Sequence, residues 1–297
     1  MDTPIQKEQK RIYWWFLAPA AILYTVFFVV PALGTLWISF NKWPGAGDMR
    51  WVGIRNYRIM YHDPVFWLSF VNTLKILFIV GGATFLISFG LMMVLRDMMG
   101  RSFVRSVLFF PNILSGVVIA ILWGFLFQAD GLVNQFLMLA GMDNPPKWLN
   151  ENMMINVVML GLIWVSTGFY TTILMAGADR IPKHLYEDCA LAGAGTFQKF
   201  RFVTLPLMWE VFGIAAVLWT ISSIKIFEFI LAFAGAVGFL PPVKTWNLAL
   251  YSYAEAFSGE GTPRYGTASA SAVVMLLLVV VLVLLLRRAM RRETLQF

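Results

Sequence analysis

Charged residues are scarce in this chain, and cysteine and histidine are almost absent. Of its 297 residues only 13% are charged, while 59% are hydrophobic. A soluble domain carries about 25% charged residues, and a chain this apolar has too little polar surface to cover itself in water. The composition therefore excludes an ordinary cytoplasmic enzyme, a disordered regulator and a DNA-binding domain. We expect a membrane protein with several spanning segments.

Motifs that support catalysis or metal binding are also missing. One cysteine and two histidines, far apart in the sequence, exclude a disulfide scaffold and a His/Cys zinc site. No phosphate-binding loop of the form G-x-x-x-x-G-K-[ST] occurs, so we expect the chain not to bind and hydrolyse ATP itself. Cys189 lies among alanines, which favours a small packing residue over a nucleophile. We predict no catalytic residue and no metal site.

Six apolar stretches are long enough to cross a bilayer, which takes about 20 helical residues. They are residues 13–40, 68–95, 105–128, 154–178, 208–234 and 266–287. The first follows basic residues, as a signal peptide does, but its apolar run continues to Phe40, beyond the core of about 7–15 residues of such a peptide. Pro31 should kink this span. We predict an all-α integral membrane protein with six transmembrane helices.

Lysine and arginine are unevenly distributed between the loops. If the N-terminus lies inside the cell, the inner segments hold 14 of these cations and the outer loops hold 7. The outer cations are Lys42, Arg50, Arg55, Arg58, Lys147, Lys244 and Arg264. Because cytoplasmic loops carry an excess of Lys and Arg, we predict that both termini are cytoplasmic. Topology then explains the net charge of +7, and nucleic acid is not an expected partner.

The inner loop, residues 179–207, contains the most specific pattern in the chain. Tyr186 to Leu191 favours a short helix, and Phe197 to Thr204 favours a second one. The residues that start, turn or stop these helices are Pro182, Gly193, Gly195 and Pro206. We expect Pro182 in the first turn, a sharp turn at the two glycines, and a stop at Pro206. The loop should form a compact helix–turn–helix that lies flat at the membrane surface.

This loop resembles the signature of permease subunits of bacterial ABC importers, E-A-A-x-x-x-G-x(9)-I-x-L-P. The matching positions are Glu187, Gly193, Val203, Leu205 and Pro206, with Val for Ile. Asp188 and Cys189 stand where the alanines usually occur, and Ala192 stands where the sugar-type family often has Asp. The structural alternative is an ordinary connecting hairpin that matches this spacing by chance.

Further segments resemble the maltose-type, or oligosaccharide, class of these permeases from about residue 13 to the C-terminus. They include Gly53–Tyr57, Asp63–Trp67 and Asn72–Thr73. One departure is the stretch at 234–241, which replaces a Thr-x-Gly-Gly-Pro near the outer gate of the class. The resemblance implies the type I ABC importer permease fold in one transmembrane permease domain, residues 1–297. It also implies location in a bacterial inner (plasma) membrane.

The resemblance also implies partners and a coupling surface. The loop would dock on a cytoplasmic ATPase through Glu187, Asp188, Ala190, Gly193, Ala194, Leu205 and Pro206. The complete importer would contain a second permease subunit, two ATPase subunits and an external solute-binding protein that delivers the sugar. ATP and Mg²⁺ would be held by the ATPases, and this chain would carry no cofactor.

Polar residues inside the predicted spans are expensive in lipid and therefore suggest function. In the fifth span Lys225 and Glu228 are three residues apart, and Ser222 and Trp219 precede them by one and two turns. This stripe predicts either a lining for a hydroxyl-rich substrate or a structural Lys–Glu pair with interhelical serine hydrogen bonds. With the family register, the predicted lining set is Ser166, Phe169, Trp219, Ser222, Ser223, Ile226 and Glu228.

Three other functions fit parts of the pattern. An importer permease for glycerol phosphate or another polyol would share the loop and differ in substrate. An ion-coupled secondary transporter would take up its substrate without an ATPase, although the inverted repeats common in such transporters are not detectable. A membrane-embedded enzyme would remain active when purified alone.

Overall fold

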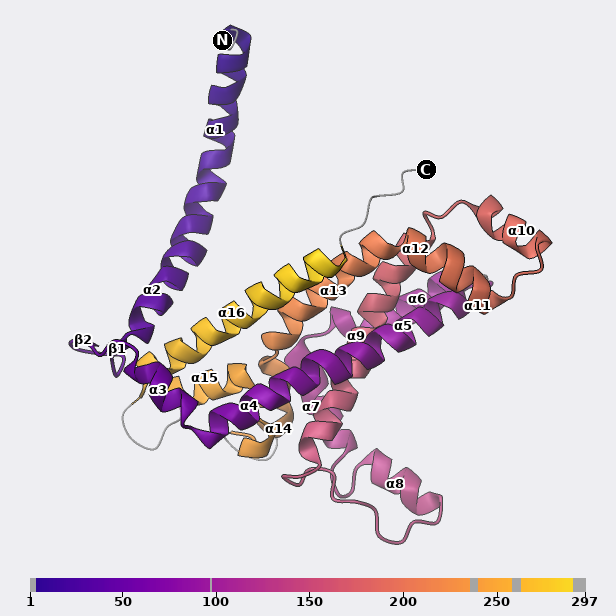
Figure 1. The fold of residues 1–297 in the computed structure, drawn as a ribbon. Helices are drawn as coiled ribbons and strands as arrows, with labels where there is room; N and C mark the ends of the chain where they lie inside the picture. Colours follow the sequence, from indigo (N-terminus) through magenta and orange to yellow (C-terminus); the bar gives the residue numbers. More distant parts are fainter. Residues whose placement is uncertain (1–3, 97, 236–239, 258–262, 291–297) are drawn as a thin grey trace. The chain divides into compact units, whose positions relative to one another are not determined.

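The structure is a computed structural model that describes residues 4–96, 98–235, 240–257 and 263–290. The described residues are helical except for loops and one short antiparallel ladder, in which β1 (Asn41–Lys42) pairs with β2 (Arg50–Trp51). Figure 1 labels the helices and strands along the chain, which divides into two compact units. Unit 1 comprises Met1–Asp63 and Ser252–Val274, and unit 2 comprises Pro64–Tyr251 and Met275–Phe297. Each unit is described by itself.

The N-terminal helix of unit 1 is interrupted by a π-helical turn. Helix α1 (Pro4–Tyr24) runs into the π turn η1 (Thr25–Val29) and then into α2 (Val30–Ser39). Pro31 lies in the first turn of α2, where it has no N–H to donate and its ring crowds the preceding turn. A π turn relieves this conflict by widening the backbone ladder. The distortion expected at Pro31 is therefore a π turn that ends two residues before it.

Buried polar contacts hold the loop after α2 in place within unit 1. Helix α3 (Arg55–Tyr61) carries Asn56, whose side-chain amide donates to the carbonyl oxygens of Ser39 (2.8 Å) and Asn41 (2.9 Å). A Cβ added at Gly266, near the start of α16 (Tyr265–Ala289), would lie 2.2 Å from the carbonyl oxygen of Asn41. Glycine is required at 266 because the two backbone segments touch there.

Unit 2 begins with a long helix and continues with shorter ones. The first elements are α4 (Pro64–Lys75), the π turn η2 (Ile76–Val80), α5 (Gly81–Leu95), α6 (Arg101–Phe109), the 3₁₀ turn η3 (Phe110–Ile113), α7 (Gly116–Leu126), α8 (Leu132–Leu139) and α9 (Met154–Ala178). The later ones are α10 (Lys183–Leu191), α11 (Thr196–Lys199), the π turn η4 (Phe200–Thr204), α12 (Leu205–Leu207), α13 (Trp209–Ile224), α14 (Glu228–Gly235) and the 3₁₀ turn η5 (Val243–Thr245). Helix α15 (Leu248–Phe257) follows and crosses the unit boundary.

Four helices among the described residues are long and apolar enough to cross a membrane. They are Tyr13–Ser39, Pro64–Leu95, Met154–Ala178 and Tyr265–Ala289. Two bent pairs raise the number to six if each pair is one span: Arg101–Ile113 with Gly116–Leu126, bent by 97°, and Thr196–Leu207 with Trp209–Ile224, bent by 74°. The chain is thus a helical membrane protein with four to six candidate spans.

The prediction of an unbroken fifth span at 208–234 is wrong. Helix α13 ends at Ile224, Lys225 leaves the helical conformation, and α14 begins at Glu228. Neither proline nor glycine occupies the break. The break leaves backbone groups without helical hydrogen-bond partners. One of them, the carbonyl oxygen of Ile226, accepts a hydrogen bond from the side-chain amide of Asn247, which is fully buried. A hydropathy pattern does not reveal this break because the partner lies about 20 residues further along the chain.

Buried polar side chains tie the segment after α14 to the rest of unit 2. The amide of Asn72 in α4 donates to the carbonyl oxygens of Lys244 and Trp246, both at 2.9 Å. The hydroxyl of Thr73 accepts the backbone N–H of Leu248 at 3.0 Å, and the side-chain oxygen of Asn247 accepts that of Leu250 at 3.0 Å. The backbone of this segment can be buried outside a helix because side chains form hydrogen bonds with its polar groups.

We expect Asn247→Ala to destabilise the protein. The change leaves the carbonyl of Ile226 and the N–H of Leu250 without their partner, and each buried unsatisfied group costs about 1–3 kcal/mol. The midpoint of a thermal unfolding scan on the detergent-solubilised protein, followed by tryptophan fluorescence, should fall. Asn144→Ala, at an exposed position, is the matched control and should leave the midpoint unchanged. Equal midpoints for the two variants would show that Asn247 does not hold the break.

Candidate functional site

The segment between α9 and α13 forms the two short helices that the sequence predicted (Figure 1). Helix α10 begins at Lys183, so Pro182, predicted in the first turn, is the N-cap residue directly before it. The second helix consists of α11, the π turn η4 and α12. The predicted stop at Pro206 is wrong, because the helix continues to Leu207 and bends at Met208. The π turn η4 ends two residues before Pro206 and accommodates its missing N–H.

The turn after α10 depends on one glycine. Gly193 has a φ of +76°, and its N–H donates to the carbonyl of Ala190 at 3.0 Å. The N–H of Ala194 reaches back to the carbonyl of Cys189 at 2.9 Å, which completes a Schellman motif. Gly195 is extended, with φ −72° and ψ 170°, a conformation open to any residue. The turn therefore requires glycine at 193, and the prediction that it also requires glycine at 195 is wrong.

Tyr186 anchors α10 to the body of unit 2. Its side chain is only 8% exposed and belongs to an apolar cluster that includes Met92, Leu174 and Met208. Its hydroxyl lies 3.0 Å from that of Thr204 in η4, and the guanidinium of Arg96 lies 3.7 Å from the centre of its ring. Packing, a hydrogen bond and a cation–π contact together hold α10 against the ends of the longer helices.

The predicted coupling residues lie mainly on the outer surface of this hairpin. Glu187, Asp188, Ala190 and Gly193 are exposed, whereas Ala194, Leu205 and Pro206 are half-buried. Sequence reasoning missed three apolar side chains of the hairpin that are strongly exposed: Leu191 (89%), Phe197 (69%) and Phe202 (69%). Large apolar side chains left in the open indicate a contact surface. Apolar character alone does not separate them from Leu185, Phe200 and Val203, which pack against the buried cluster.

Two carboxylates of this region, Asp179 and Glu187, differ in whether a neighbouring cation compensates them. Asp179, which follows α9, accepts a hydrogen bond from Arg101 (3.0 Å) and lies 3.9 Å from Arg105. Glu187 borders a cavity of about 520 Å³ together with Arg96 and Lys183. Glu187 forms no ion pair with any described residue, so its carboxylate is available to a partner.

The predicted polar stripe of the fifth span is not continuous. Lys225 and Glu228 fall on opposite sides of the break between α13 and α14, so they do not share one helical face. Both side chains are exposed, and neither forms an ion pair with a described residue. The structural Lys–Glu pair considered from the sequence is therefore absent from the described residues.

Trp219 and Ser223 are buried inside unit 2. Trp219 is 5% exposed, and its indole N–H donates to the carbonyl oxygen of Leu77 in the π turn η2 at 2.8 Å. A Cβ added at Gly81 would lie 2.2 Å from the indole nitrogen, so the ring fits only against glycine. The expectation that Trp219 presents a stacking surface to a substrate does not agree with this burial. Its position serves helix packing.

The remaining residues of the predicted substrate lining are exposed or half-buried. Ser222 and Glu228 are exposed, and Ser166, Phe169 and Ile226 are half-buried. Glu228, the first residue of α14, borders a cavity of about 470 Å³ whose other described lining residues are apolar. Sequence reasoning also missed Asn247, which fixes the backbone at Ile226. Residues 236–239 of the predicted gate stretch at 234–241 lie outside the described residues.

Comparisons with known proteins identify the family. No protein-family model matches the chain. It is 31% identical over 265 residues to a probable ABC transporter permease protein of Pyrococcus horikoshii, with 87% of this chain and 89% of that protein covered. It is 26% identical over 277 residues to the trehalose/maltose transport system permease protein of Thermococcus litoralis, with 92% and 91% covered.

The fold agrees with this assignment. A crystal structure of a bacterial ABC transporter involved in the import of the acidic polysaccharide alginate matches with a TM-score of 0.83 at 22% identity. The match covers 99% of this chain and 100% of that one. The chain therefore belongs to the ABC transporter permease family, as the resemblance of its inner loop indicated.

We expect Gly193→Ala to loosen the hairpin and Gly195→Ala to leave it intact. A Cβ at the positive φ of Gly193 costs about 1–2 kcal/mol, although no neighbouring atom lies close enough to clash. At Gly195 the backbone is extended and the nearest atom to an added Cβ is 3.8 Å away. Amide hydrogen exchange across 183–199 should accelerate in the first variant alone. Equal exchange in both variants would contradict the special role of Gly193.

Proposed function

We propose that this chain is the membrane-spanning subunit of a binding-protein-dependent ABC importer whose substrate is a di- or oligosaccharide. The names of its relatives carry this proposal. One is the trehalose/maltose permease of Thermococcus litoralis, another is the lactose transport system permease of Rhizobium radiobacter, and a third is the alpha-glucoside transport system permease of Rhizobium meliloti. The location that goes with this function is a bacterial inner membrane.

The hairpin of α10 and α11 is the proposed docking element for a cytoplasmic ATPase. Leu191, Phe197 and Phe202 supply exposed apolar area, and Glu187 supplies a charge that has no partner among the described residues. Tyr186 fixes α10 to the longer helices, so a movement imposed on the hairpin is passed on to them. Closure of two ATPases around ATP and Mg²⁺ would then rock the spans between inward-open and outward-open states.

The proposed assembly contains a second permease subunit, two ATPase subunits and an external solute-binding protein. Support for the last comes from a crystal structure of a bacterial alginate ABC transporter in complex with an alginate pentasaccharide-bound periplasmic protein. ATP hydrolysis takes place on the ATPases, since this chain has no phosphate-binding loop.

The substrate path proposed for this chain runs along the break in the fifth span. Ser222, Ile226 and Glu228 flank that break, and Ser166 and Phe169 of α9 complete the proposed set. A carboxylate and a hydroxyl are suited to the hydroxyl groups of a sugar, and backbone outside a helix offers further donors and acceptors. Trp219 and Ser223 support this region from inside the helix packing.

We further propose one permease domain, residues 1–297, with six spans and both termini in the cytoplasm. Arg101–Ile113 with Gly116–Leu126 then counts as one span and α13 with α14 as another, while Thr196–Leu207 stays in the hairpin outside the membrane. Reporter fusions at Phe297 and in the 129–153 loop should report opposite compartments, because an odd number of spans separates the two points. The same compartment at both points would contradict the six-span topology.

One assay tests substrate class and coupling together. The purified complex, reconstituted with its binding protein, should hydrolyse ATP faster when the binding protein carries a particular di- or oligosaccharide. Glu187→Lys should reduce this stimulation by roughly tenfold or more, because loss of one partner of a desolvated charge pair costs about 2–5 kcal/mol. The measurement is phosphate release across a panel of sugars and polyols.

Glu210→Lys, an equal charge reversal at the start of α13, is the matched control and should keep full stimulation. Stimulation by glycerol phosphate or another polyol alone would replace the sugar by that substrate. Ion-coupled uptake without any ATPase would contradict the importer. Full coupling in Glu187→Lys would contradict the docking role of α10.

A further inference from the structure

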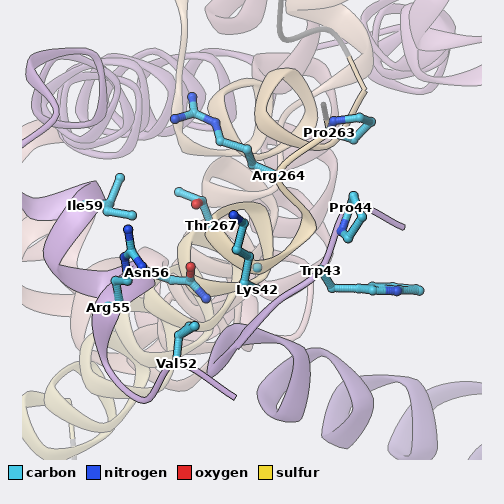
Figure 2. Close-up of a pocket in the computed structure, with 11 residues that line it drawn as sticks. Lys42, Trp43, Pro44, Val52, Arg55, Asn56, Ile59, Pro263, Arg264 and Thr267 are labelled. Carbon is cyan, nitrogen blue, oxygen red and sulfur yellow. The ribbon is translucent and has the colours of Figure 1, made fainter. Parts of the chain in front are cut away.

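A cavity of about 410 Å³ lies within unit 1, where the span that ends at Ser39 passes into the β1–β2 ladder and where α16 begins (Figure 2). Lys42 of β1, Arg55 of α3 and Arg264, directly before α16, contribute three cations to its wall. No acidic side chain is among the described residues that line the cavity. Its wall is therefore electropositive.

The charge of this wall is only partly compensated. Arg264 forms an ion pair with Glu255, which lies outside the lining. Burial raises the pKa of the Glu255 carboxyl, and the adjacent Arg264 guanidinium acts in the opposite direction. Lys42 and Arg55 form no ion pair with a described residue. Two uncompensated cations facing one concave space favour an anionic ligand.

Buried polar groups complete the interior of the cavity. Thr267 is only 3% exposed, and it belongs to the residues that line the cavity. Asn56 is also buried, and its amide nitrogen is held by the carbonyls of Ser39 and Asn41. In Figure 2 the ends of Lys42 and Thr267 are directed toward the same space. An anion there would receive one donor from each of these side chains.

The surroundings place this cavity at the depth of lipid headgroups. It begins three residues after a membrane-spanning helix ends and includes the first residues of another. Aromatic rings accompany it: Trp43 lies 5.4 Å from Tyr265, and Trp51 stacks near Phe40 at 5.5 Å, measured between ring centroids. Trp and Tyr rings gather at the membrane–water interface. The anions of that layer are lipid phosphates.

We propose that this cavity binds the phosphate of an anionic lipid headgroup, with Lys42 and Arg55 as its charge partners and Thr267 as a hydrogen-bond donor. The apolar part of the wall, which includes Val52 and Ile59, accommodates the glycerol and the first carbons of the acyl chains. On the proposed topology this lipid belongs to the outer leaflet. The site is independent of the transported substrate.

The test uses the purified full-length chain in its complex, with phosphatidylglycerol and phosphatidylethanolamine as probes and native mass spectrometry as the readout. The wild type should retain phosphatidylglycerol in preference to phosphatidylethanolamine. Lys42→Gln combined with Arg55→Gln should weaken phosphatidylglycerol retention about 30-fold, since each cation near an anionic surface contributes roughly a fivefold factor. Arg58→Gln is the matched control, because Arg58 lies on α3 outside the cavity wall, and it should retain lipid like the wild type.

Further variants and a competition experiment distinguish loss of lipid binding from loss of folding, and a lipid ligand from free phosphate. Lys42→Arg with Arg55→Lys keeps both charges and should keep phosphatidylglycerol, and if the double glutamine variant does not assemble, Lys42→Gln alone should show the fivefold loss. Excess inorganic phosphate should leave the lipid bound; its displacement of the lipid would identify free phosphate as the ligand and overturn the lipid assignment. Equal phosphatidylglycerol retention by the wild type and the glutamine variants would overturn the site itself.

Discussion

Within a bilayer, every backbone N–H and C=O must find its partner inside the protein, because lipid offers none. Long uninterrupted helices meet this requirement automatically, yet this chain departs from regular helix at η1, η2, η4 and the break at 225–227. Two of these departures are satisfied by buried side chains of distant elements. The indole of Trp219 reaches Leu77 in η2, and the amide of Asn247 reaches Ile226 in the break. The irregular backbone of unit 2 thus depends on a few buried polar groups.

The same arrangement explains how a short surface hairpin and the helices can act together. Helix α10 packs against the longer helices through Tyr186 and the neighbouring Leu185, and its outer face is open. Tyr186 combines packing with a hydrogen bond and the Arg96 contact. A hairpin that is fixed at its base and exposed at its tip can transmit a push from a partner. A hairpin packed along its whole length would have no surface left for one.

Structural features were predicted correctly from the sequence where they depend on residues close together in the chain. Hydropathy located the long helices, and Gly193 was correctly expected at the turn, because only a residue without a Cβ accepts that φ readily. Spacing of Glu187, Gly193 and Leu205-Pro206 was specific enough to indicate the family that the comparisons then identified. Each of these features depends on residues close together in the chain.

The predictions that were wrong concern residues whose contacts are with partners distant in sequence. The break after Ile224 carries no proline or glycine and exists with the support of Asn247, and Trp219 is buried because Gly81, 138 positions earlier, leaves room for its ring. Likewise, Lys42, Arg55 and Arg264 form one cavity only after β1, α3 and the start of α16 come together. The sequence by itself determined the helical membrane class, the hairpin and its glycine turn, since these follow from local backbone and hydropathy rules. Tertiary structure alone decided which polar and aromatic side chains face inward, because burial is set by the elements that pack against them.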